Sequence, residues 1–358
     1  MKVLLLGEFS GLYKNLKVGL EKNGIEVVWY ASQDGFKKIE GMDRDVCGHT
    51  GIKLYDKLIY PLKLVLSAPK CDVIQMVHPL IFSPYINALL IKILKKKSTI
   101  LCLSASGTDY AVYKYGKRNE KPYEYHILDD SREYDELYAQ YGRFVKNEEK
   151  ILDLCEGIIP SNTEYAMAYE GNPKKRNTIC LPMDIEKIVY SENVVKDKVI
   201  FFHGLNREIF KGTRYIREAM ERLKTNYPDE VEIIIDGHMP IDKYLMIMRK
   251  ANVIVDQCKS YSIGINALYA MAQGKIVLSG AEDLSIRGVD KLDYPVWNIE
   301  PNSDQIYKVL ETIVKDKEKI PQWGKRTRKF VEKYYDCEKV AKEYIMTWKK
   351  IMVEKKLF

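Results

Sequence analysis

The sequence lacks the features that mark membrane-spanning, disulfide-rich and zinc-binding proteins. No apolar run reaches the eighteen residues expected of a spanning helix. Seven cysteines are scattered along the chain without a Cys-x-x-Cys pair, which argues against a zinc site and a disulfide framework. The apolar run at 2–7 is too short for the core of a signal peptide. We therefore expect a cytoplasmic protein that is at most peripheral on the inner face of the membrane.

The chain also has no low-complexity segment and no short repeat. Instead, strand and helix patterns alternate along its 358 residues, as they do in α/β proteins with parallel, doubly wound sheets. The series starts twice, which predicts two Rossmann-like domains. The predicted strands are 2–6, 25–30, 72–78, 98–104 and 156–160 in the first domain, and 198–203, 231–236, 252–256, 275–279 and 295–299 in the second.

The net charge of +7 is unevenly placed. Residues 324–358 hold eleven Lys or Arg and five Asp or Glu, so the rest of the chain almost balances. A second cluster, Lys92 with the lysines at 95–97, ends an apolar helix-like segment at 80–94, where it could serve only as a cap. Both clusters suit an anionic membrane surface, at about 1 kcal/mol per basic residue. Nucleic acid is not an expected partner, because no binding motif or basic–aromatic stripe is present.

A glycine turn with two cations follows the apolar run at 199–202. Gly204 lets the backbone turn, and a helical pattern begins at Thr213. Arg207 and Lys211 therefore lie at the mouth of a strand-to-helix unit, where a helix N-terminus and two cations suit a pyrophosphate. We expect both cations to be exposed on a loop. The alternative is a solvated basic loop without a ligand.

The segment 252–280 supports the diphosphate interpretation. It is predicted to be a strand, a loop with Gly264, a helix at 265–273 that stops at Gly274, and another strand. Gly264 stands at a second helix N-terminus of the phosphate-binding type. Together the two segments resemble the nucleotide-sugar half of GT-B glycosyltransferases, above all the retaining family four, or glycosyl transferases group 1. The resemblance covers most of the chain.

The resemblance implies two Rossmann-like domains that face each other across a cleft. The first, 1–183, would bind the acceptor, and the second, 184–325, would bind the nucleotide sugar. The joint would follow the proline-containing segment 181–184. A C-terminal helical segment, 326–358, would cross back to the first domain through one helical stripe of apolar residues. This stripe consists of Ala341, Ile345, Trp348 and Met352.

The activity implied is sugar transfer from a nucleoside diphosphate sugar to a glycan or lipid-linked acceptor, in bacterial surface polysaccharide synthesis. Retention of configuration follows from the same resemblance. We expect no cofactor, and no metal ion if Arg207 and Lys211 serve as the cations of the site. Arg207 and Lys211 would neutralise the leaving diphosphate. Asp43 and Asp45 match a metal-binding Asp-x-Asp, but no predicted strand precedes them, and we interpret them as part of a solvated loop. The alternatives are a nucleotide-sugar epimerase of the same fold and a non-catalytic glycan-binding or scaffold protein.

In the first domain, the loop at 7–11 resembles the glycine-rich loop through which these enzymes approach the donor, so Gly11 is a donor-binding candidate. The loop lacks the spacing of a dinucleotide fingerprint, which argues against a nicotinamide dehydrogenase. His78 ends a predicted strand and Asp109 comes shortly after the end of another, where α/β proteins usually place functional groups. We take both as catalytic candidates, and a structural role is the alternative for each.

Most donor-binding candidates lie in the second domain, and His203 among them is assigned no proton transfer. At two of these positions the sequence departs from the family. A Glu-x7-Glu pair usually flanks the Gly264 turn, and its second carboxylate binds the ribose, whereas Tyr261 and Tyr269 occupy those two places here. A phenol can hydrogen-bond a ribose hydroxyl, but the tyrosine side chain is neutral and is longer than that of glutamate. The candidates in this domain are His203, Gly204, Asn206, Gly237, His238, Tyr261, Ile263, Gly264, Ile265 and Tyr269.

Overall fold

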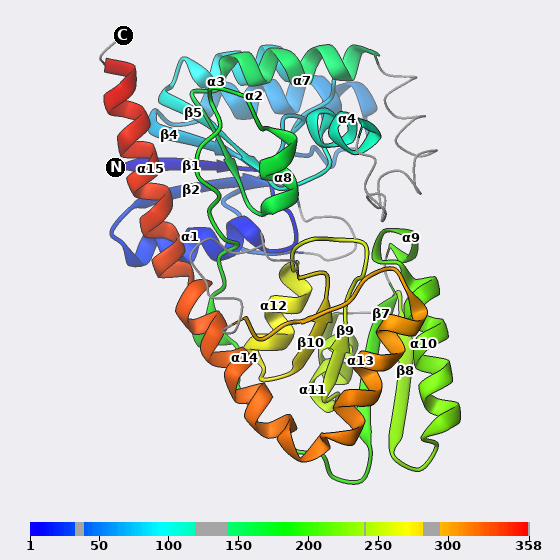
Figure 1. The fold of residues 1–358 in the computed structure, drawn as a ribbon. Coiled ribbons are helices and arrows are strands. Elements are labelled where there is room, and N and C mark those ends of the chain that lie inside the picture. Colours follow the sequence, from blue (N-terminus) through cyan, green and yellow to red (C-terminus); the bar gives the residue numbers. More distant parts are fainter. Residues whose placement is uncertain (33–38, 119–141, 206, 240, 282–293, 357–358) are drawn as a thin grey trace. The chain divides into compact units, whose positions relative to one another are not determined.

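Parallel strands with helices between them make up both halves of the chain (Figure 1). The computed structural model describes residues 1–358 except 33–38, 119–141, 206, 240, 282–293 and 357–358. The described residues form two compact units. Unit 1 holds Met1–Tyr115, the described part of Glu133–Asp184 and the segment from Asp336, and unit 2 holds Ile185–Tyr335 together with residues 116–118. The predicted α/β fold with two parallel sheets is confirmed.

Unit 1 contains a six-stranded parallel sheet in the order β3-β2-β1-β4-β5-β6. The central strands are apolar on both faces, as expected for a parallel sheet that is covered on both sides. The sequence predicted all of these strands except β3, which pairs with the end of β2. The interpretation of Asp45 as part of a loop was therefore wrong. The strands are β1 Lys2–Leu6, β2 Glu26–Ala31, β3 Arg44–Asp45, β4 Cys71–Met76, β5 Ser98–Ala105 and β6 Gly157–Pro160.

Helices cover both faces of this sheet (Figure 1). One face is covered by α2, α3 and α7, which contribute Leu64, Leu90 and Ile151 to the core. The other face is covered by α1 and α15. The helices that lie in or begin in unit 1 are α1 Leu12–Lys22, α2 Tyr60–Ser67, α3 Asn87–Lys95, α4 Tyr110–Arg118, α7 Gly142–Leu154, α8 Thr163–Ala168 and α15 Cys337–Lys356, and a π-helical turn, Tyr55–Ile59, leads into α2.

The C-terminal helix packs on unit 1, as predicted. Gly19 of α1 lies so close to the backbone of Cys337 that any side chain there would overlap it. Trp348 of α15 donates its indole N–H to Gln75 Oε1 on β4 at 2.8 Å. The predicted stripe was right for Ala341 and Trp348, whereas Ile345 and Met352 are only partly buried. The buried residues of α15 are Cys337, Val340, Ala341, Tyr344, Trp348 and Ile351.

Unit 2 contains a five-stranded parallel sheet in the order β11-β10-β9-β7-β8. Phe201, Val253 and Leu278 from three of its strands pack with Ile216 and Leu310 from the helices. The strands are β7 Val199–Leu205, β8 Val231–Gly237, β9 Val253–Val255, β10 Ile276–Ser279 and β11 Trp297–Asn298. The helices are α9 Glu208–Lys211, α10 Thr213–Asn226, α11 Ile241–Lys250, α12 Ile265–Ala272, α13 Ser303–Lys315 and α14 Ile320–Tyr334.

Each sheet has one point where the strand order reverses, between β1 and β4 in unit 1 and between β7 and β9 in unit 2. The loops that leave the carboxyl ends of two such strands turn to opposite faces, which opens a crevice for a ligand. These two points are therefore where the fold itself places candidate sites. Among the described residues, no helix is both long and apolar enough to cross a bilayer.

Candidate active site

The connection from β7 to α10 is a tight turn with unusual backbone angles. Arg207 has a φ of 55°, in the left-handed region that residues other than glycine rarely adopt. Gly212 has a φ of 74°, and a Cβ there would overlap the Cys258 sulfur. Between them α9 forms a single helical turn. Such a backbone is typical of functional sites, where the surrounding structure holds the strained conformation in place.

Lys211 is buried at the end of this turn and forms an ion pair. Its Nζ lies 2.9 Å from Asp256 Oδ1 and 3.4 Å from the carbonyl oxygen of Gly204. Asp256 Oδ1 also accepts a hydrogen bond from Asn266 Nδ2 at 2.8 Å, and Asn266 Oδ1 accepts one from the Tyr244 hydroxyl. Only 6% of the Lys211 surface is exposed. The expectation of an exposed loop cation was therefore wrong for this residue.

Arg207 is exposed, as expected. Its guanidinium carbon lies 3.8 Å from the centre of the Phe210 ring. A guanidinium that stacks on a ring is of the kind that recognises phosphate through its N–H groups. The two cations thus differ, because Lys211 is fixed in a buried network and Arg207 reaches toward solvent.

The N-terminus of α12 is open. Gly264 makes no side-chain cap, and a Cβ built on it would meet no atom within 4 Å. Tyr269 and Ile265 lie on the partly buried side of α12 together with Asn266, whereas Leu268 and Met271 face the core. An uncapped helix N-terminus beside Asn266 can accept an anion. Tyr261 and Ile263, in the loop before α12, are buried.

His203 is engaged at both ring nitrogens. Nδ1 lies 2.7 Å from the carbonyl oxygen of Val255, to which it donates, and Nε2 lies 2.8 Å from the Thr213 hydroxyl. Burial, helped by the Lys211 charge, lowers the pKa of His203 to about 4. The imidazole is therefore neutral and connects β7, β9 and α10, which agrees with assigning it no proton transfer.

The end of β8 supplies the remaining candidates of unit 2. A Cβ at Gly237 would overlap the carbonyl oxygen of Leu205, its partner on β7, so the close strand pairing requires glycine. His238 follows with a φ of 53°. Asn206 lies outside the described residues. The structure thus brings Gly204, Gly237 and His238 to the same sheet edge as Lys211.

In unit 1 the loop at 7–11 follows β1. Gly7 and Gly11 both have a φ near 90°. The buried Glu8 carboxylate accepts hydrogen bonds from the backbone N–H groups of Gly11 at 2.8 Å and Lys14 at 2.9 Å. These backbone N–H groups at the start of α1, which could bind an anion, thus donate to the carboxylate of Glu8.

His78 and Asp109 interact electrostatically at the ends of β4 and β5. His78 Nδ1 accepts the backbone N–H of Leu80 at 3.0 Å. Asp109 is buried and accepts hydrogen bonds from the Tyr169 hydroxyl at 2.6 Å and from the backbone of Val112 at the start of α4. Burial lowers the pKa of His78 and raises that of Asp109, although each group counteracts the shift of the other. Asp109 thus caps a helix, and a catalytic role for either residue stays a prediction.

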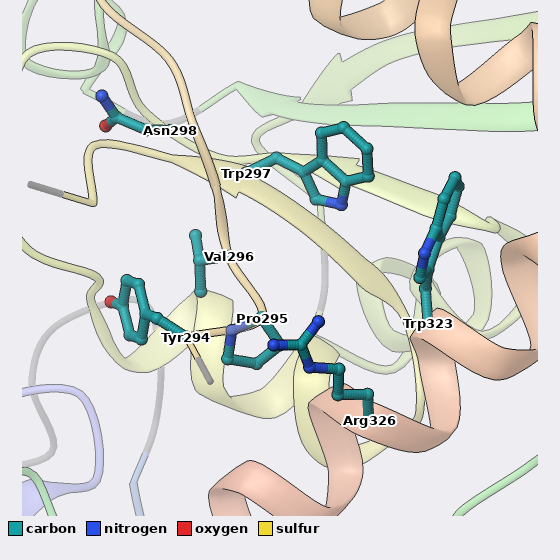
Figure 2. Close-up of a pocket in the computed structure, with 7 residues that line it drawn as sticks. All are labelled: Tyr294, Pro295, Val296, Trp297, Asn298, Trp323 and Arg326. Carbon is teal, nitrogen blue, oxygen red and sulfur yellow. The ribbon is translucent and has the colours of Figure 1, made fainter. Parts of the chain in front are cut away.

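A separate pocket of about 290 Å³ lies at the β11 edge of unit 2. Figure 2 shows the indole rings of Trp297 and Trp323 next to each other, with the Arg326 guanidinium reaching toward Pro295. The ring centres are 5.1 Å apart. The sequence did not single out this pocket, and β10 separates its strand from β9. In the part of the chain that the structure describes, no group of three or more His, Cys, Asp or Glu could hold a metal.

Sequence reasoning missed three members of the polar network in unit 2, namely Asp256, Asn266 and Tyr244. Asp256 follows the apolar strand β9 directly, and a polar residue at that place is a usable signal for a site. Asn266 lies in the first turn of the predicted helix, where an amide can serve a ligand or the backbone. Tyr244 in α11 gives no such signal, because its contact with Asn266 depends on the packing of α11 against β7.

Solved structures share this fold across nearly the whole chain. Sucrose-phosphate synthase from Thermosynechococcus elongatus matches with a TM-score of 0.63 at 16% identity, over 99% of this chain and 100% of that chain. HepE from Anabaena, in complex with UDP-glucose, matches with a TM-score of 0.62 at 13% identity, over 98% and 100%.

A UDP-GlcNAc 2-epimerase from Neisseria meningitidis, bound to UDP-GlcNAc, matches with a TM-score of 0.55 at 13% identity, over 98% of this chain and 100% of that chain. No family model and no curated protein matches the sequence. At these identities the comparisons show the fold, and the predicted two-domain α/β fold of the GT-B type is confirmed.

Proposed function

We propose that this protein is a glycosyltransferase that moves a sugar from a nucleoside diphosphate sugar to a glycan or lipid-linked acceptor, with retention of configuration, in bacterial surface polysaccharide synthesis. The observation that carries the proposal is the buried Lys211–Asp256 pair at the strand reversal between β7 and β9. The open N-terminus of α12 belongs to the same network through Asn266. The shared fold with proteins bound to UDP-glucose and UDP-GlcNAc supports the proposal.

The residues of unit 2 would act on the leaving group. When the bond from the sugar to the diphosphate breaks, its electron pair stays on the diphosphate oxygen, and negative charge grows there. Lys211 uses two of its three N–H groups on Asp256 and Gly204 among the described residues, so one remains for a phosphate oxygen. Arg207 would add its guanidinium edge, and the first N–H groups of α12 would add dipoles.

With these groups in place we propose that transfer needs no metal ion and no cofactor. A chelator added to an active preparation should leave the rate of transfer nearly unaltered. Inhibition that manganese or magnesium reverses would contradict this part of the proposal.

The diphosphate site is tested by calorimetry with UDP and GDP. Arg207→Ala should weaken the binding of at least one of them by about 1.5–3 kcal/mol, the value of a hydrogen bond to a charged group. The melting temperature should stay the same, because exposed cations add little stability. Arg222→Ala is the matched control, since this exposed guanidinium also stacks on a ring, 4.1 Å from the centre of Tyr307. Equal affinity in wild type and Arg207→Ala would remove Arg207 from the site.

An epimerase acting on the nucleotide sugar is the second candidate, because the epimerase from Neisseria meningitidis shares the fold. The two candidates differ in their products. A transferase releases a nucleoside diphosphate and glycosylates an acceptor, whereas an epimerase returns an altered nucleotide sugar. Chromatography of the nucleotides after incubation separates the two outcomes.

A further inference from the structure

Unit 1 has an exposed apolar surface on the outer side of α2. The π-helical turn and α2 form one helical segment, 55–67, whose inner side buries Leu64 and Val65. Its outer side exposes Ile59, Leu62 and Leu66, by 41%, 37% and 57%. Their spacing of three and four residues places them on one helical face. This helix is therefore apolar on both sides, although the core covers only one of them.

The exposed surface continues before α2 and across to α3. Ile52 and Leu54 are exposed by 64% and 65%, and Tyr85 and Leu89, just before and in α3, are exposed by 75% and 57%. The helices α2 and α3 lie side by side (Figure 1). We call these seven side chains the α2/α3 surface. A cluster of this kind marks an interaction site, because scattered single residues are the norm on a protein surface.

Lysines outnumber acidic residues in the segments that carry the α2/α3 surface. Segments 52–70 and 80–97 hold eight lysines and one acidic residue, Asp56. Two of the lysines have structural roles: Lys97 Nζ donates to the carbonyl oxygens of Leu66 and Ala68 at the end of α2, and Lys95 pairs with Glu156. The Asp56 carboxylate accepts hydrogen bonds from Thr50 and Gly51. The six remaining lysines are exposed, namely Lys53, Lys57, Lys63, Lys70, Lys92 and Lys96.

We propose that the α2/α3 surface docks on an anionic lipid bilayer. Leucine, isoleucine and tyrosine side chains would enter the interfacial layer, while the exposed lysines of the same segments would meet the anionic headgroups. A second copy of the chain fits less well, because a symmetric contact would bring two strongly cationic surfaces together. This inference specifies the membrane contact of a transferase with a lipid-linked acceptor, and it does not depend on the donor chemistry.

The proposal is tested by sedimentation with phosphatidylcholine vesicles, with and without phosphatidylglycerol, at low and high salt. Two variants alter the surface: Leu66→Ser with Leu89→Ser, and Lys92→Glu with Lys96→Glu. The matched controls on α15 are Met346→Ser with Val353→Ser and Lys349→Glu with Lys350→Glu. Met346 and Val353 are exposed by 62% and 60%, and the two lysines are also exposed. These controls also test the basic C-terminal cluster as a competing membrane contact.

The wild type should sediment with anionic vesicles only, and salt should release it. About 1 kcal/mol per basic residue is about fivefold in partition, so Lys92→Glu with Lys96→Glu should bind at least about 25-fold more weakly. Leu66→Ser with Leu89→Ser should also lose binding, while both α15 controls bind like wild type. Absence of binding at low salt, or loss only in the α15 controls, would overturn the proposal.

Two further measurements keep the outcomes distinct. The fluorescence of Leu66→Trp should shift to the blue on anionic vesicles and be quenched by brominated lipid, and an unchanged spectrum would contradict insertion of this surface. Light scattering that shows a wild-type dimer and a monomeric Leu66→Ser with Leu89→Ser variant would assign the surface to a second copy instead. UDP binding by these variants should equal that of wild type, so failure of lipid binding leaves the donor site to be judged separately.

Discussion

Lys211 and Asp256 depend on each other at the carboxyl end of β7. Their side chains are exposed by only 7% and 2%, so neither charge is well solvated. Removing one partner from a buried pair leaves an uncompensated charge, which costs far more than removing both. The sequence shows a lysine in a loop but not the buried carboxylate 45 residues later that holds it.

This dependence predicts different outcomes for two variants. Lys211→Met should lower the free energy of unfolding by about 3–5 kcal/mol, because Asp256 loses its cation. Lys211→Met with Asp256→Asn should recover most of that stability, since the amide oxygen can still accept from Asn266. Both variants should lose UDP affinity. Urea unfolding and calorimetry measure the two properties, and a double variant that binds UDP like wild type would exclude Lys211 from the diphosphate site.

Tyr269 stands where the resemblance to family-four glycosyltransferases places a ribose carboxylate, and it shares the partly buried side of α12 with Asn266. Tyr269→Phe should weaken donor binding by about 0.5–1.5 kcal/mol, the net value of one neutral hydrogen bond. Tyr269→Glu should restore or improve binding, because an ionised acceptor forms the stronger bond. Donor affinity and melting temperature are measured for both. Unchanged donor affinity in Tyr269→Phe, together with a lower melting temperature in Tyr269→Glu, would instead make Tyr269 a packing residue.

The buried His203 makes stability depend on pH. Its pKa of about 4 is below the value of about 6.5 in an unfolded chain. Between these values the unfolded chain binds a proton that the folded protein does not, so the stabilising effect is complete above pH 6.5 and is lost as the pH falls toward 4. The His203 imidazole should therefore show no NMR titration above about pH 5. A midpoint near 6.5 would contradict the two hydrogen bonds described for this ring.

At the scale of elements, the ends of β8 and α12 each use a glycine for a different reason. A Cβ at Gly237 would overlap the backbone of Leu205, whereas a Cβ at Gly264 would meet open space. Gly237→Ala should therefore lower the melting temperature. Gly264→Ala should fold normally and weaken UDP binding roughly tenfold, about 1.4 kcal/mol, because its methyl would stand where the phosphate approaches the helix N-terminus. Full UDP affinity in Gly264→Ala would exclude this end of α12.

The sequence predicted nearly every strand within about two residues, since the strands of a covered parallel sheet are short apolar runs between turns. It failed at β3, where Arg44 and Asp45 have no apolar pattern and pair only with the end of β2. The buried stripe of α15 also differs from the predicted one. Ile345 and Tyr344 are both suitable for a core, and the packing of α15 against α1 and β5 selects Tyr344. Helical faces are thus harder to predict than strands.

At the scale of the whole molecule, charge counted along the chain differs from charge arranged in space. In the sequence, nearly all of the excess positive charge falls in residues 324–358. In the structure α14 belongs to unit 2 and α15 to unit 1, so these cations do not share one unit. Segments 52–70 and 80–97 converge on adjacent helices. Their apolar residues look like core in the sequence, and only the structure shows which of them face outward.

The boundaries proposed for the domains, at 183 and 325, stay predictions. Contacts within the described chain divide it at Asp184 and return it to unit 1 at Asp336. The proline-containing segment 181–184 indicates the first of these positions in the sequence. The second has none, because α14 ends and α15 begins within three residues and both are amphipathic helices.

The central claim is that the network around Lys211 binds the diphosphate of a sugar donor that the protein cleaves. The most direct test is a screen of nucleotide sugars in which release of the nucleoside diphosphate is followed together with the fate of the sugar, for wild type and for Lys211→Met with Asp256→Asn. We predict that wild type releases the diphosphate from at least one donor and that the double variant, although folded, does not. Equal release by both proteins, or an altered nucleotide sugar without release, would contradict the account.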